Sequence, residues 1–350
     1  MSRFFSEKYS KLVPYTPGEQ PKDTQYIKLN TNESPFPPSE KAVKAAGEAA
    51  EMLNLYPDPD CTALRGMLSE RLGVDTNEVI LTNGSDEVLN FAFMAFCDEK
   101  TPAAFADITY GFYSVFAQIN CLPYKIIPLN DDFTQNADAY CGLKKTIFIA
   151  NPNAPTGIAL PISDIEKILR SNPDNIVVID EAYVDFGNES CIPLIHKYDN
   201  LLVTGTFSKS RSMAGARLGF GVASSEIIRD LNTVRYSTNP YNINRMTMAA
   251  GIGVLSDEEY TKSNCKKIIE NREFTMNELK KLGFEMTDSK ANFVFAKHSG
   301  ISGENLYKAL KDRGILVRHF TGEKISDYNR ITIGTREQME ALVKTVKELI

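Results

Sequence analysis

Two short segments carry side chains that could perform amine chemistry on a carbonyl compound. Lys209 is a candidate nucleophile, because a lysine held in a closed pocket near cationic groups loses its proton more easily and attacks an aldehyde. Asp180 ends the apolar run that begins at Ile176, and a buried carboxylate could keep the nitrogen of a pyridine-like ring protonated. Tyr183 could hydrogen-bond a phenolic oxygen of that ring. Together these residues predict a site where a protonated ring withdraws electrons from a substrate.

A second group of residues is suited to hold a phosphate. Gly84 allows close approach to the backbone, and the helix expected after it points free N–H groups at the same place. Thr206 and Ser208 add hydroxyl donors, and Arg217 can bind a phosphate with two parallel hydrogen bonds. Each feature has a plainer interpretation as a helix cap or a surface residue. Their combination favours a binding site.

Short apolar runs that alternate with helical patterns predict the sheet that positions these residues. Such an alternation implies a mostly parallel sheet covered by helices on both faces. Ligands bind such sheets at the carboxyl ends of the strands, where Asp180, Lys209 and the loop Asn151–Gly157 are expected. The expected strands are Val79–Thr82, Ala103–Ile108, Thr146–Ala150, Ile176–Asp180, Leu201–Gly205 and Leu218–Ala223.

The last third of the chain has a different pattern. A long amphipathic helix is expected over Asp257–Leu282, followed by short strands near Asn292–Ala296, Ile315–Arg318 and Arg330–Ile333. Two capping boxes, Ser163 with Glu166 and Thr335 with Gln338, predict the starts of helices.

Three parts follow from these patterns. Residues 1–40 are expected to pack on the small domain and around the active site. Residues 41–240 form the large α/β domain that holds the ligand, and residues 241–350 form a smaller α+β domain.

Composition excludes several classes of protein. The chain has 350 residues and 43% hydrophobic content, enough for two packed domains. Its net charge of −6 and lack of a basic cluster argue against a nucleic-acid partner. No apolar run could span a membrane and no secretory signal is present, so the cytoplasm is the expected compartment. Three scattered histidines predict no metal site, and six scattered cysteines predict free, buried thiols.

The motifs in their order along the chain resemble those of fold-type I aminotransferases, which are α/β enzymes that use pyridoxal 5′-phosphate. The resemblance rests on Asn151-Pro152-Asn153-Ala154-Pro155-Thr156-Gly157, Asp180-Glu181-Ala182-Tyr183, Ser208-Lys209 and Ala214-Gly215-Ala216-Arg217-Leu218-Gly219. From about Tyr15 to the C-terminus the chain is similar to the class II family of histidinol-phosphate aminotransferases. The additional matching motifs are Leu29-Asn30-Thr31-Asn32-Glu33, Leu55-Tyr56-Pro57, Gly84-Ser85-Asp86-Glu87, Thr109-Tyr110-Gly111-Phe112-Tyr113 and Arg330-Ile331-Thr332-Ile333-Gly334-Thr335.

The resemblance implies a role for each matching residue. Lys209 forms the Schiff base with the cofactor and moves protons, Asp180 binds the ring nitrogen, and Tyr183 contacts the phenolic oxygen. Tyr56 reaches the cofactor phosphate of a partner subunit, which implies a homodimer. Tyr110 stacks on the ring, and the phosphate is held through the remaining implied residues, which are Gly84, Ser85, Asp86, Thr206, Ser208 and Arg217.

One position departs from the family pattern. Ala154 stands where the family often has a second asparagine that bonds the phenolic oxygen. Either Asn153 supplies this contact, or Tyr183 makes it alone.

The implied reaction is transamination between L-histidinol phosphate and 2-oxoglutarate, a step of histidine biosynthesis. Arg330 then binds a carboxylate in one half-reaction and a phosphate in the other, and the other implied substrate residues are Tyr15, Tyr241, Asn292 and Arg318. A threonine-phosphate decarboxylase or an aromatic amino-acid aminotransferase remains an alternative, since fold does not determine substrate. A cofactor-binding transcriptional regulator is a further alternative, but it would need a DNA-binding module before Tyr15.

Overall fold

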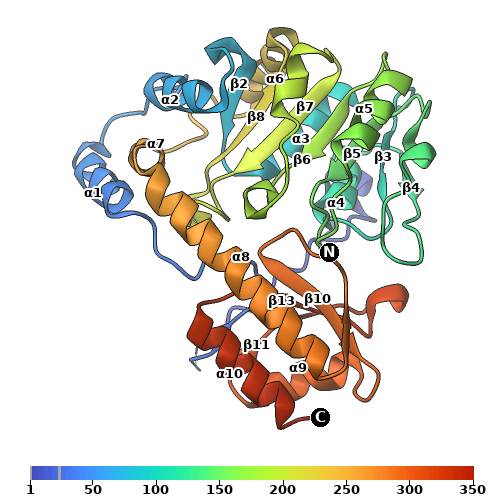
Figure 1. Cartoon of the computed structure of the whole chain (residues 1–350). Coiled ribbons are helices and arrows are strands. Elements are labelled where there is room, and N and C mark those ends of the chain that lie inside the picture. The colour runs from blue at the N-terminus through green and yellow to red at the C-terminus, as the bar shows by residue number, and fades with distance from the viewer. Residues whose placement is uncertain (1, 23–24) are drawn as a thin grey trace.

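The computed structural model describes residues 2–22 and 25–350, and its largest feature is a seven-stranded sheet (Figure 1). The strands are β2 (Val79–Thr82), β3 (Ala103–Ala106), β4 (Tyr124–Ile127), β5 (Thr146–Ala150), β6 (Val177–Asp180), β7 (Leu201–Thr206) and β8 (Gly219–Ala223). Their order is β2-β8-β7-β6-β5-β3-β4. Only β8 runs antiparallel to its neighbours within this sheet. The expected mostly parallel α/β sheet is therefore confirmed.

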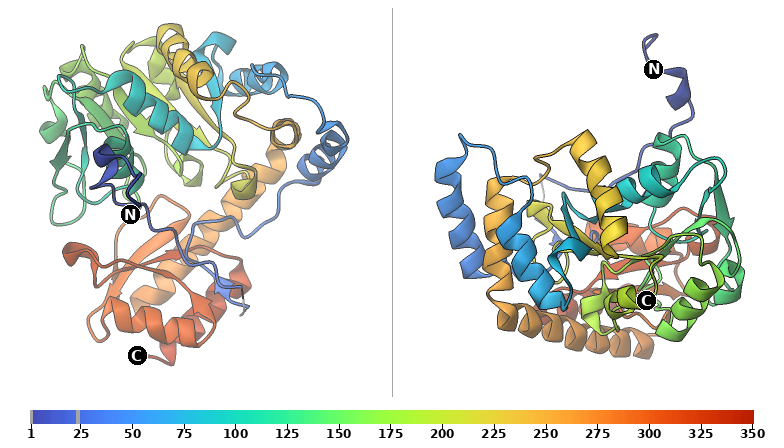
Figure 2. Two further views of the ribbon diagram at one scale, coloured as in Figure 1. Left: turned by 180° about the vertical axis from the view of Figure 1, so that it is seen from behind. Right: turned by 90° about the horizontal axis from the view of Figure 1, so that it is seen from above.

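Helices cover both faces of this sheet (Figures 1 and 2). Alternate side chains of β5 enter different cores: Ile147 and Ile149 join the hydrophobic cluster on one face of the sheet, whereas Phe148 joins the cluster on the other face. Both faces are thus apolar, which explains the continuous hydrophobic runs of the central strands. The helices are α1 (Glu40–Ala49), α2 (Thr62–Leu72), α3 (Ser85–Phe96), α4 (Phe112–Ile119), α5 (Ile162–Ser171), α6 (Ser225–Thr238), α7 (Arg245–Leu255), α8 (Glu258–Lys281), α9 (Gly303–Asp312) and α10 (Arg336–Lys347).

A smaller antiparallel sheet lies below the large one in Figure 1, drawn in orange and red. Its strands are β9 (Phe284–Met286), β10 (Phe293–His298), β12 (Arg318–His319) and β13 (Asn329–Thr332), in the order β12-β13-β10-β9. Residues of α8, α9 and α10 pack on it to form a third hydrophobic core. The long helix α8 connects this part to the large sheet (Figure 1).

The N-terminal segment runs from the large sheet to the small one (Figure 2). The backbone N–H of Val13 donates to the side chain of Gln118 on α4. Farther along, β1 (Ile27–Lys28) pairs in parallel with β11 (Ile315–Leu316). The single strand expected over Ile315–Arg318 is therefore split: β11 binds the N-terminal segment, and β12 joins the small sheet.

Several expectations from the sequence are corrected by the structure. Ser163 does not cap α5, because that helix already begins at Ile162, and Glu166 accepts hydrogen bonds from Lys197 and Tyr198 instead. The sequence analysis did not identify β4, an edge strand whose first three residues are exposed and which therefore lacks a long apolar run. All six cysteines are free, but Cys121 is exposed and Cys141 is only partly buried. Among the described residues, no helix is long and apolar enough to cross a membrane.

The second expected capping box, Thr335 with Gln338, is present. Its contribution to stability can be compared with that of Ser163, where the expected capping box is absent. Thr335 Oγ1 accepts from the backbone of Gln338, whose side chain accepts from the Thr335 backbone at 2.9 Å. We expect Thr335→Ala to lower the free energy of unfolding by about 1 kcal/mol, measured by urea titration. The control is Ser163→Ala, which should change it by less than about 0.5 kcal/mol because Ser163 is exposed and caps nothing. Equal losses in the two variants would contradict this assignment.

Candidate active site

The carboxyl ends of β5, β6 and β7 meet at one edge of the large sheet. Asp180 at the end of β6 lies beside Ala150 on β5 and Thr204 on β7. A cavity of about 340 Å³, here called the strand-end cavity, lies at this edge. The predicted site residues that line it are Ser85, Asp86, Tyr110, Asp180, Tyr183, Thr206, Ser208, Lys209 and Arg217.

Asp180 is a buried carboxylate whose neighbours are neutral donors. Tyr113 donates its hydroxyl to Oδ2 at 3.0 Å, and Thr204 donates to Oδ1 at 3.3 Å. Burial raises the pKa of Asp180 to about 6, and these hydrogen bonds only partly oppose the effect. Among the described residues, no lysine or arginine pairs with it. A cationic N–H group of a ligand in the cavity would supply the missing partner.

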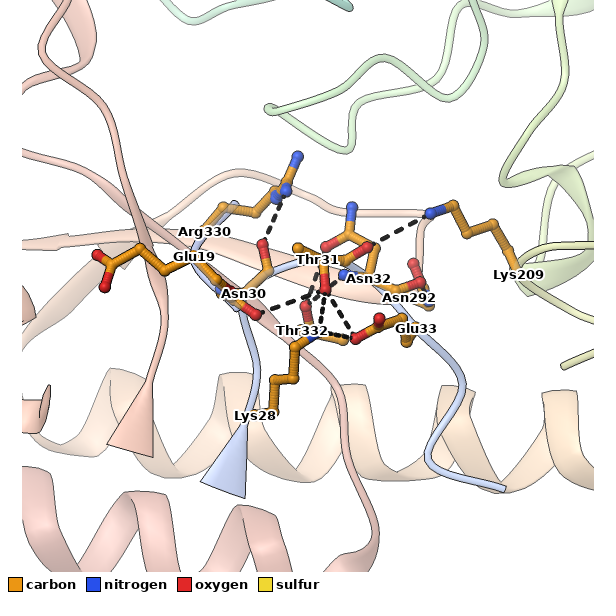
Figure 3. A network of polar contacts seen from close by, with 10 residues as sticks. All are labelled: Glu19, Lys28, Asn30, Thr31, Asn32, Glu33, Lys209, Asn292, Arg330 and Thr332. Atoms are coloured by element: carbon orange, nitrogen blue, oxygen red, sulfur yellow. Dashed lines mark hydrogen bonds and ion pairs between the residues drawn. The ribbon is translucent and has the colours of Figure 1, made fainter. Parts of the chain in front are cut away.

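Lys209 follows the end of β7 and reaches towards the N-terminal segment (Figure 3). Its Nζ donates to the backbone oxygen of Thr31 at 3.4 Å. The same Nζ lies 5.8 Å from the centroid of the Tyr183 ring. The hydroxyl oxygen of Tyr183 accepts a hydrogen bond from the side chain of Asn32 at 2.9 Å. The amine and the tyrosine therefore share one end of the cavity.

The amino end of α3 and an arginine form an anion-binding corner in the same cavity. Gly84, just before α3, has a left-handed φ of 74°, and a Cβ built on it would lie 2.6 Å from Nη2 of Arg217. Only glycine permits this approach. Arg217 pairs with Asp86 at 2.9 Å, and Tyr110 donates its hydroxyl to the same carboxylate at 2.6 Å. The corner presents helix N–H groups and a guanidinium, both of which attract a phosphate.

A second cavity of about 650 Å³, here called the arginine cavity, shares Tyr110, Tyr183 and Lys209 with the first. Arg330 on β13 lines it and donates to the backbone oxygen of Asn30 at 3.1 Å (Figure 3). Burial lowers the pKa of Arg330, although the guanidinium stays charged at neutral pH. Its Nε is buried without a hydrogen-bond partner among the described residues.

Arg318 and Tyr15 line the arginine cavity beside Arg330. Arg318 donates to the backbone oxygens of Thr16 and Pro17 at 3.1 and 3.2 Å, which ties the N-terminal segment to β12. Within the described part of the chain, neither arginine forms an ion pair with a carboxylate. Two guanidinium groups that are not paired with a carboxylate among the described residues favour an anionic ligand.

Comparison with known proteins identifies the family. The family model described as "Aminotransferase class I and II" matches residues 24–346. A histidinol-phosphate aminotransferase from Brachyspira hyodysenteriae is 49% identical, over 100% of this chain and 99% of that protein. The chain belongs to the histidinol-phosphate aminotransferase family.

Solved structures share its fold. The histidinol-phosphate aminotransferase from Sinorhizobium meliloti, determined with pyridoxal-5′-phosphate, superposes with a TM-score of 0.84 at 22% identity over 93% of this chain and 92% of that one. The L-threonine-O-3-phosphate decarboxylase from Porphyromonas gingivalis superposes with a TM-score of 0.80 at 23% identity over 92% and 99% of the two chains. The expected fold-type I architecture is confirmed, and the fold alone does not separate these two activities.

Some predicted residues of this aminotransferase lie outside both cavities of its own chain. The amide of Asn153 donates to Ile108 and Thr156, and Asn153 lines neither cavity. The neighbouring Ala154 lines both. Asn292 also lines neither cavity, and its amide donates to the backbone oxygen of Asn32. Both asparagines were expected at the ligand from motif position alone, but their amide N–H groups donate to backbone oxygens of distant segments.

The two remaining tyrosines are also outside the cavities. Tyr241 stacks on Tyr56 at 4.5 Å between ring centroids, and neither lines a cavity of this chain. Tyr56 is 78% exposed and Tyr241 is 41% exposed. A role for this pair in an active site therefore requires a second subunit.

The structure adds residues to which the sequence analysis gave no role. Tyr113 and Thr204 bind Asp180, and Thr31, Asn32 and Glu33 lie at the Lys209 end of the site. Four of the five lie inside motifs that matched the family, namely Leu29–Glu33 and Thr109–Tyr113. That match was the available signal, but a role could not be assigned without the tertiary contacts.

Glu181, next to Asp180, is a second buried carboxylate, and it lines neither cavity. It accepts hydrogen bonds from Ser190 and from the backbone of Cys191. Burial raises its pKa to about 7 from an ordinary 4.5. Folded protein therefore binds this proton more tightly than unfolded protein does, so stability falls as pH rises through this window.

Replacing Glu181 should remove that part of the pH dependence. We expect wild type to lose roughly 2–3 kcal/mol of unfolding free energy relative to Glu181→Gln between about pH 5 and about pH 8. Glutamine keeps both contacts, since Ser190 can accept from its amide. The measurement is urea unfolding of both proteins, in the same cofactor state, across the range. Parallel pH profiles would show that Glu181 does not titrate there.

Proposed function

We propose that this protein transaminates L-histidinol phosphate with 2-oxoglutarate, giving imidazole acetol phosphate and L-glutamate in histidine biosynthesis, with pyridoxal 5′-phosphate as cofactor. One observation carries the proposal: a cavity holding Lys209 and buried Asp180 adjoins a second cavity holding Arg318 and Arg330. Among the described residues, Asp180 has no cationic partner and neither arginine forms an ion pair. The relative at 49% identity over the whole chain bears the name of this activity.

The residues of the strand-end cavity match the parts of pyridoxal phosphate. Asp180 has no cationic partner among the described residues, and the protonated pyridine nitrogen would provide one. The anion-binding corner at Gly84, Ser85 and Arg217 suits the phosphate, and the hydroxyls of Thr206 and Ser208, 3.0 Å apart, add donors there. The cofactor residues proposed are Gly84, Ser85, Asp86, Tyr110, Asp180, Tyr183, Thr206, Ser208, Lys209 and Arg217.

The chain's own residues would then divide the work as follows. When bound, pyridoxal phosphate supplies an aldehyde and a ring that accepts electrons from the substrate. The Asp180 carboxylate holds the proton on the ring nitrogen, and the Tyr183 hydroxyl orients the ring through its phenolic oxygen. Lys209 Nζ would hold the cofactor in the absence of substrate, and as a free amine it would take a proton from the substrate carbon that bears the amino group.

Substrate selection is assigned to the arginine cavity. Arg330 would bind the carboxylate of glutamate in one half-reaction and the phosphate of histidinol phosphate in the other, because a guanidinium binds either group in two-pronged fashion. Its position on a strand of the small sheet gives it a rigid support. Arg318 and Tyr15 lie beside it and would contact the phosphorylated substrate.

Kinetics with defined substrates test this function. Wild type should use histidinol phosphate far better than histidinol, which lacks the phosphate, and far better than phenylalanine. Arg330→Ala should lower kcat/KM about 30- to 1,000-fold for both glutamate and histidinol phosphate, the scale of losing a charge-assisted pair. Arg318→Ala should affect histidinol phosphate more than glutamate.

The matched control is Arg313→Ala, an exposed arginine on the same part of the chain that binds only Ala309, and its kcat/KM should equal that of wild type. Equal use of histidinol and its phosphate would contradict the proposal and favour an amino-acid aminotransferase. Release of CO₂ from threonine phosphate without transamination would favour the decarboxylase.

We further infer a cytoplasmic homodimer with shared active sites. The exposed pair Tyr56 and Tyr241 adjoins exposed Leu53 and Leu55, an apolar surface of the kind that subunit contacts cover. The backbone oxygen of Tyr56 is held by Arg245 at 2.8 Å, so the ring projects from a supported loop. Tyr56 would reach the phosphate in the partner's strand-end cavity. Six free cysteines are consistent with a reducing compartment.

Complementation tests the shared sites. Tyr56→Ala and Lys209→Ala should each be nearly inactive alone. After subunit exchange in an equal mixture, half of the dimers are mixed and one of their two sites is intact, so about one quarter of wild-type activity should return. The control is a mixture of Arg313→Ala with Lys209→Ala. The Arg313→Ala subunit keeps both Tyr56 and Lys209, so it is active without complementation. If activity does not recover although mixed dimers have formed, or if the protein sediments as a monomer, the proposal of shared active sites is wrong.

A further inference from the structure

Asn32 occupies an unusual position between the three parts of the chain (Figure 3). It is 1% exposed and has a left-handed φ of 57°, a backbone conformation that asparagine tolerates better than most residues. Its backbone N–H donates to Thr332 Oγ1 on β13 at 2.9 Å, and its backbone oxygen accepts from Asn292 at 3.0 Å. Contacts to the small sheet therefore hold the residue in this conformation.

Hydrogen-bond accounting determines which way the side-chain amide of Asn32 points. Thr332 Oγ1 accepts a hydrogen bond from the backbone N–H of Asn32. The same hydroxyl has a single proton, which it donates to Asn32 Oδ1 at an oxygen-to-oxygen distance of 3.0 Å. Reversing the amide would leave that proton without an acceptor among the described residues, in a site where Thr332 is 2% exposed. The amide oxygen thus faces Thr332, and Nδ2 faces Tyr183.

This orientation decides what the Tyr183 hydroxyl can do. Because Nδ2 of Asn32 donates to Tyr183 Oη at 2.9 Å, the oxygen is an acceptor in that bond and its own proton stays free. No other hydrogen bond of this hydroxyl exists among the described residues, and Tyr183 lines the strand-end cavity. Ala154, which lines the same cavity and packs near Tyr183, has no donor to offer.

We propose that Asn32 is a positioning residue that directs the Tyr183 proton at the phenolic oxygen of the bound cofactor, so that Tyr183 makes alone the contact that neither Ala154 nor Asn153 provides. The proposal rests on the cofactor of the proposed function. Thr332 sets the amide of Asn32, so the small sheet is linked to the electronic state of the cofactor through two side chains.

The inference predicts a spectroscopic effect. The colour of bound pyridoxal phosphate changes with pH as the nitrogen joined to Lys209 loses its proton. A donor on the phenolic oxygen weakens that oxygen's hold on the proton and lowers the midpoint. Losing the directed Tyr183 proton should therefore raise it. Apart from Tyr183, the charged and titratable groups that line the two cavities are the same in every variant. They are Tyr15, Glu33, Asp86, Asp107, Tyr110, Asp180, Lys209, Arg217, Arg318, Glu323, Lys324 and Arg330.

The experiment is a pH titration of the visible band of the cofactor-loaded protein, without substrate. Asn32→Gly keeps the left-handed backbone and removes only the amide. It should raise the midpoint by up to about one pH unit, the scale of one hydrogen bond. Tyr183→Phe should raise it at least as much, and Asn32→Gly added to Tyr183→Phe should raise it no further.

Two further variants keep the test decisive. Thr332→Val frees the amide of Asn32 to turn, and should shift the midpoint in the same direction by a smaller amount, even if Asn32→Gly fails to fold. Asn292→Ala removes a contact of the Asn32 backbone but none of its amide, so it should lower stability in urea and leave the midpoint unchanged. A shift as large as that of Asn32→Gly in this control would assign the effect to general loosening and overturn the inference.

Other results would also overturn it. If Asn32→Gly has the same midpoint as wild type, Asn32 does not act on the cofactor. If Asn32→Gly shifts the midpoint equally with and without the Tyr183 hydroxyl, Asn32 does not act through Tyr183. Failure of the wild type to bind pyridoxal phosphate with a visible band would instead overturn the proposed cofactor chemistry itself. Loss of histidinol-phosphate activity alone, with the band and its shifts present, would affect only the substrate assignment.

Discussion

A carboxylate removed from water costs several kcal/mol unless a cation meets it, and Asp180 is held in that state at the end of a central strand. Its neighbours Tyr113 and Thr204 donate hydrogen bonds but bring no positive charge. The sheet can maintain this arrangement because both of its faces are covered by apolar cores that do not depend on the carboxylate. The unmet charge is then available to a ligand, and the protonated ring nitrogen proposed for this site would satisfy it while gaining its own stabilisation.

The second constraint is that the site is assembled from segments far apart in sequence. Residues 30–33 reach Lys209 and Tyr183 only because β1 pairs with β11 and Asn32 binds Thr332. The N-terminal segment therefore lines both cavities, and the small sheet adds Arg318 and Arg330 to the arginine cavity. Any relative motion of these parts would change the contacts of the amine and the tyrosine together.

Charge is distributed to suit anions although the whole chain has a net charge of −6. Arg217 serves the anion-binding corner, where Asp86 already orients it. Arg318 and Arg330 converge on the other cavity, and the backbone oxygens that they bind fix their direction without cancelling their charge. Local placement of a few guanidinium groups thus outweighs the overall acidity, because screening confines the field of distant surface carboxylates.

The sequence by itself determined the sheet class, most strand positions and the residues at the strand ends, since these depend on local apolar runs and on motifs such as Asp180–Tyr183. It also indicated the family, which the comparisons confirm. Only the tertiary structure decided the partners of polar side chains. Asn153 and Asn292 matched the motif positions of ligand residues, but they line neither cavity and donate to backbone oxygens of distant segments. Asn32 and Tyr113, in contrast, bind side chains that line the site. The physical reason is that a hydrogen bond depends on a fraction of an ångström and on one direction, and that geometry arises from packing between distant segments, which no local pattern encodes.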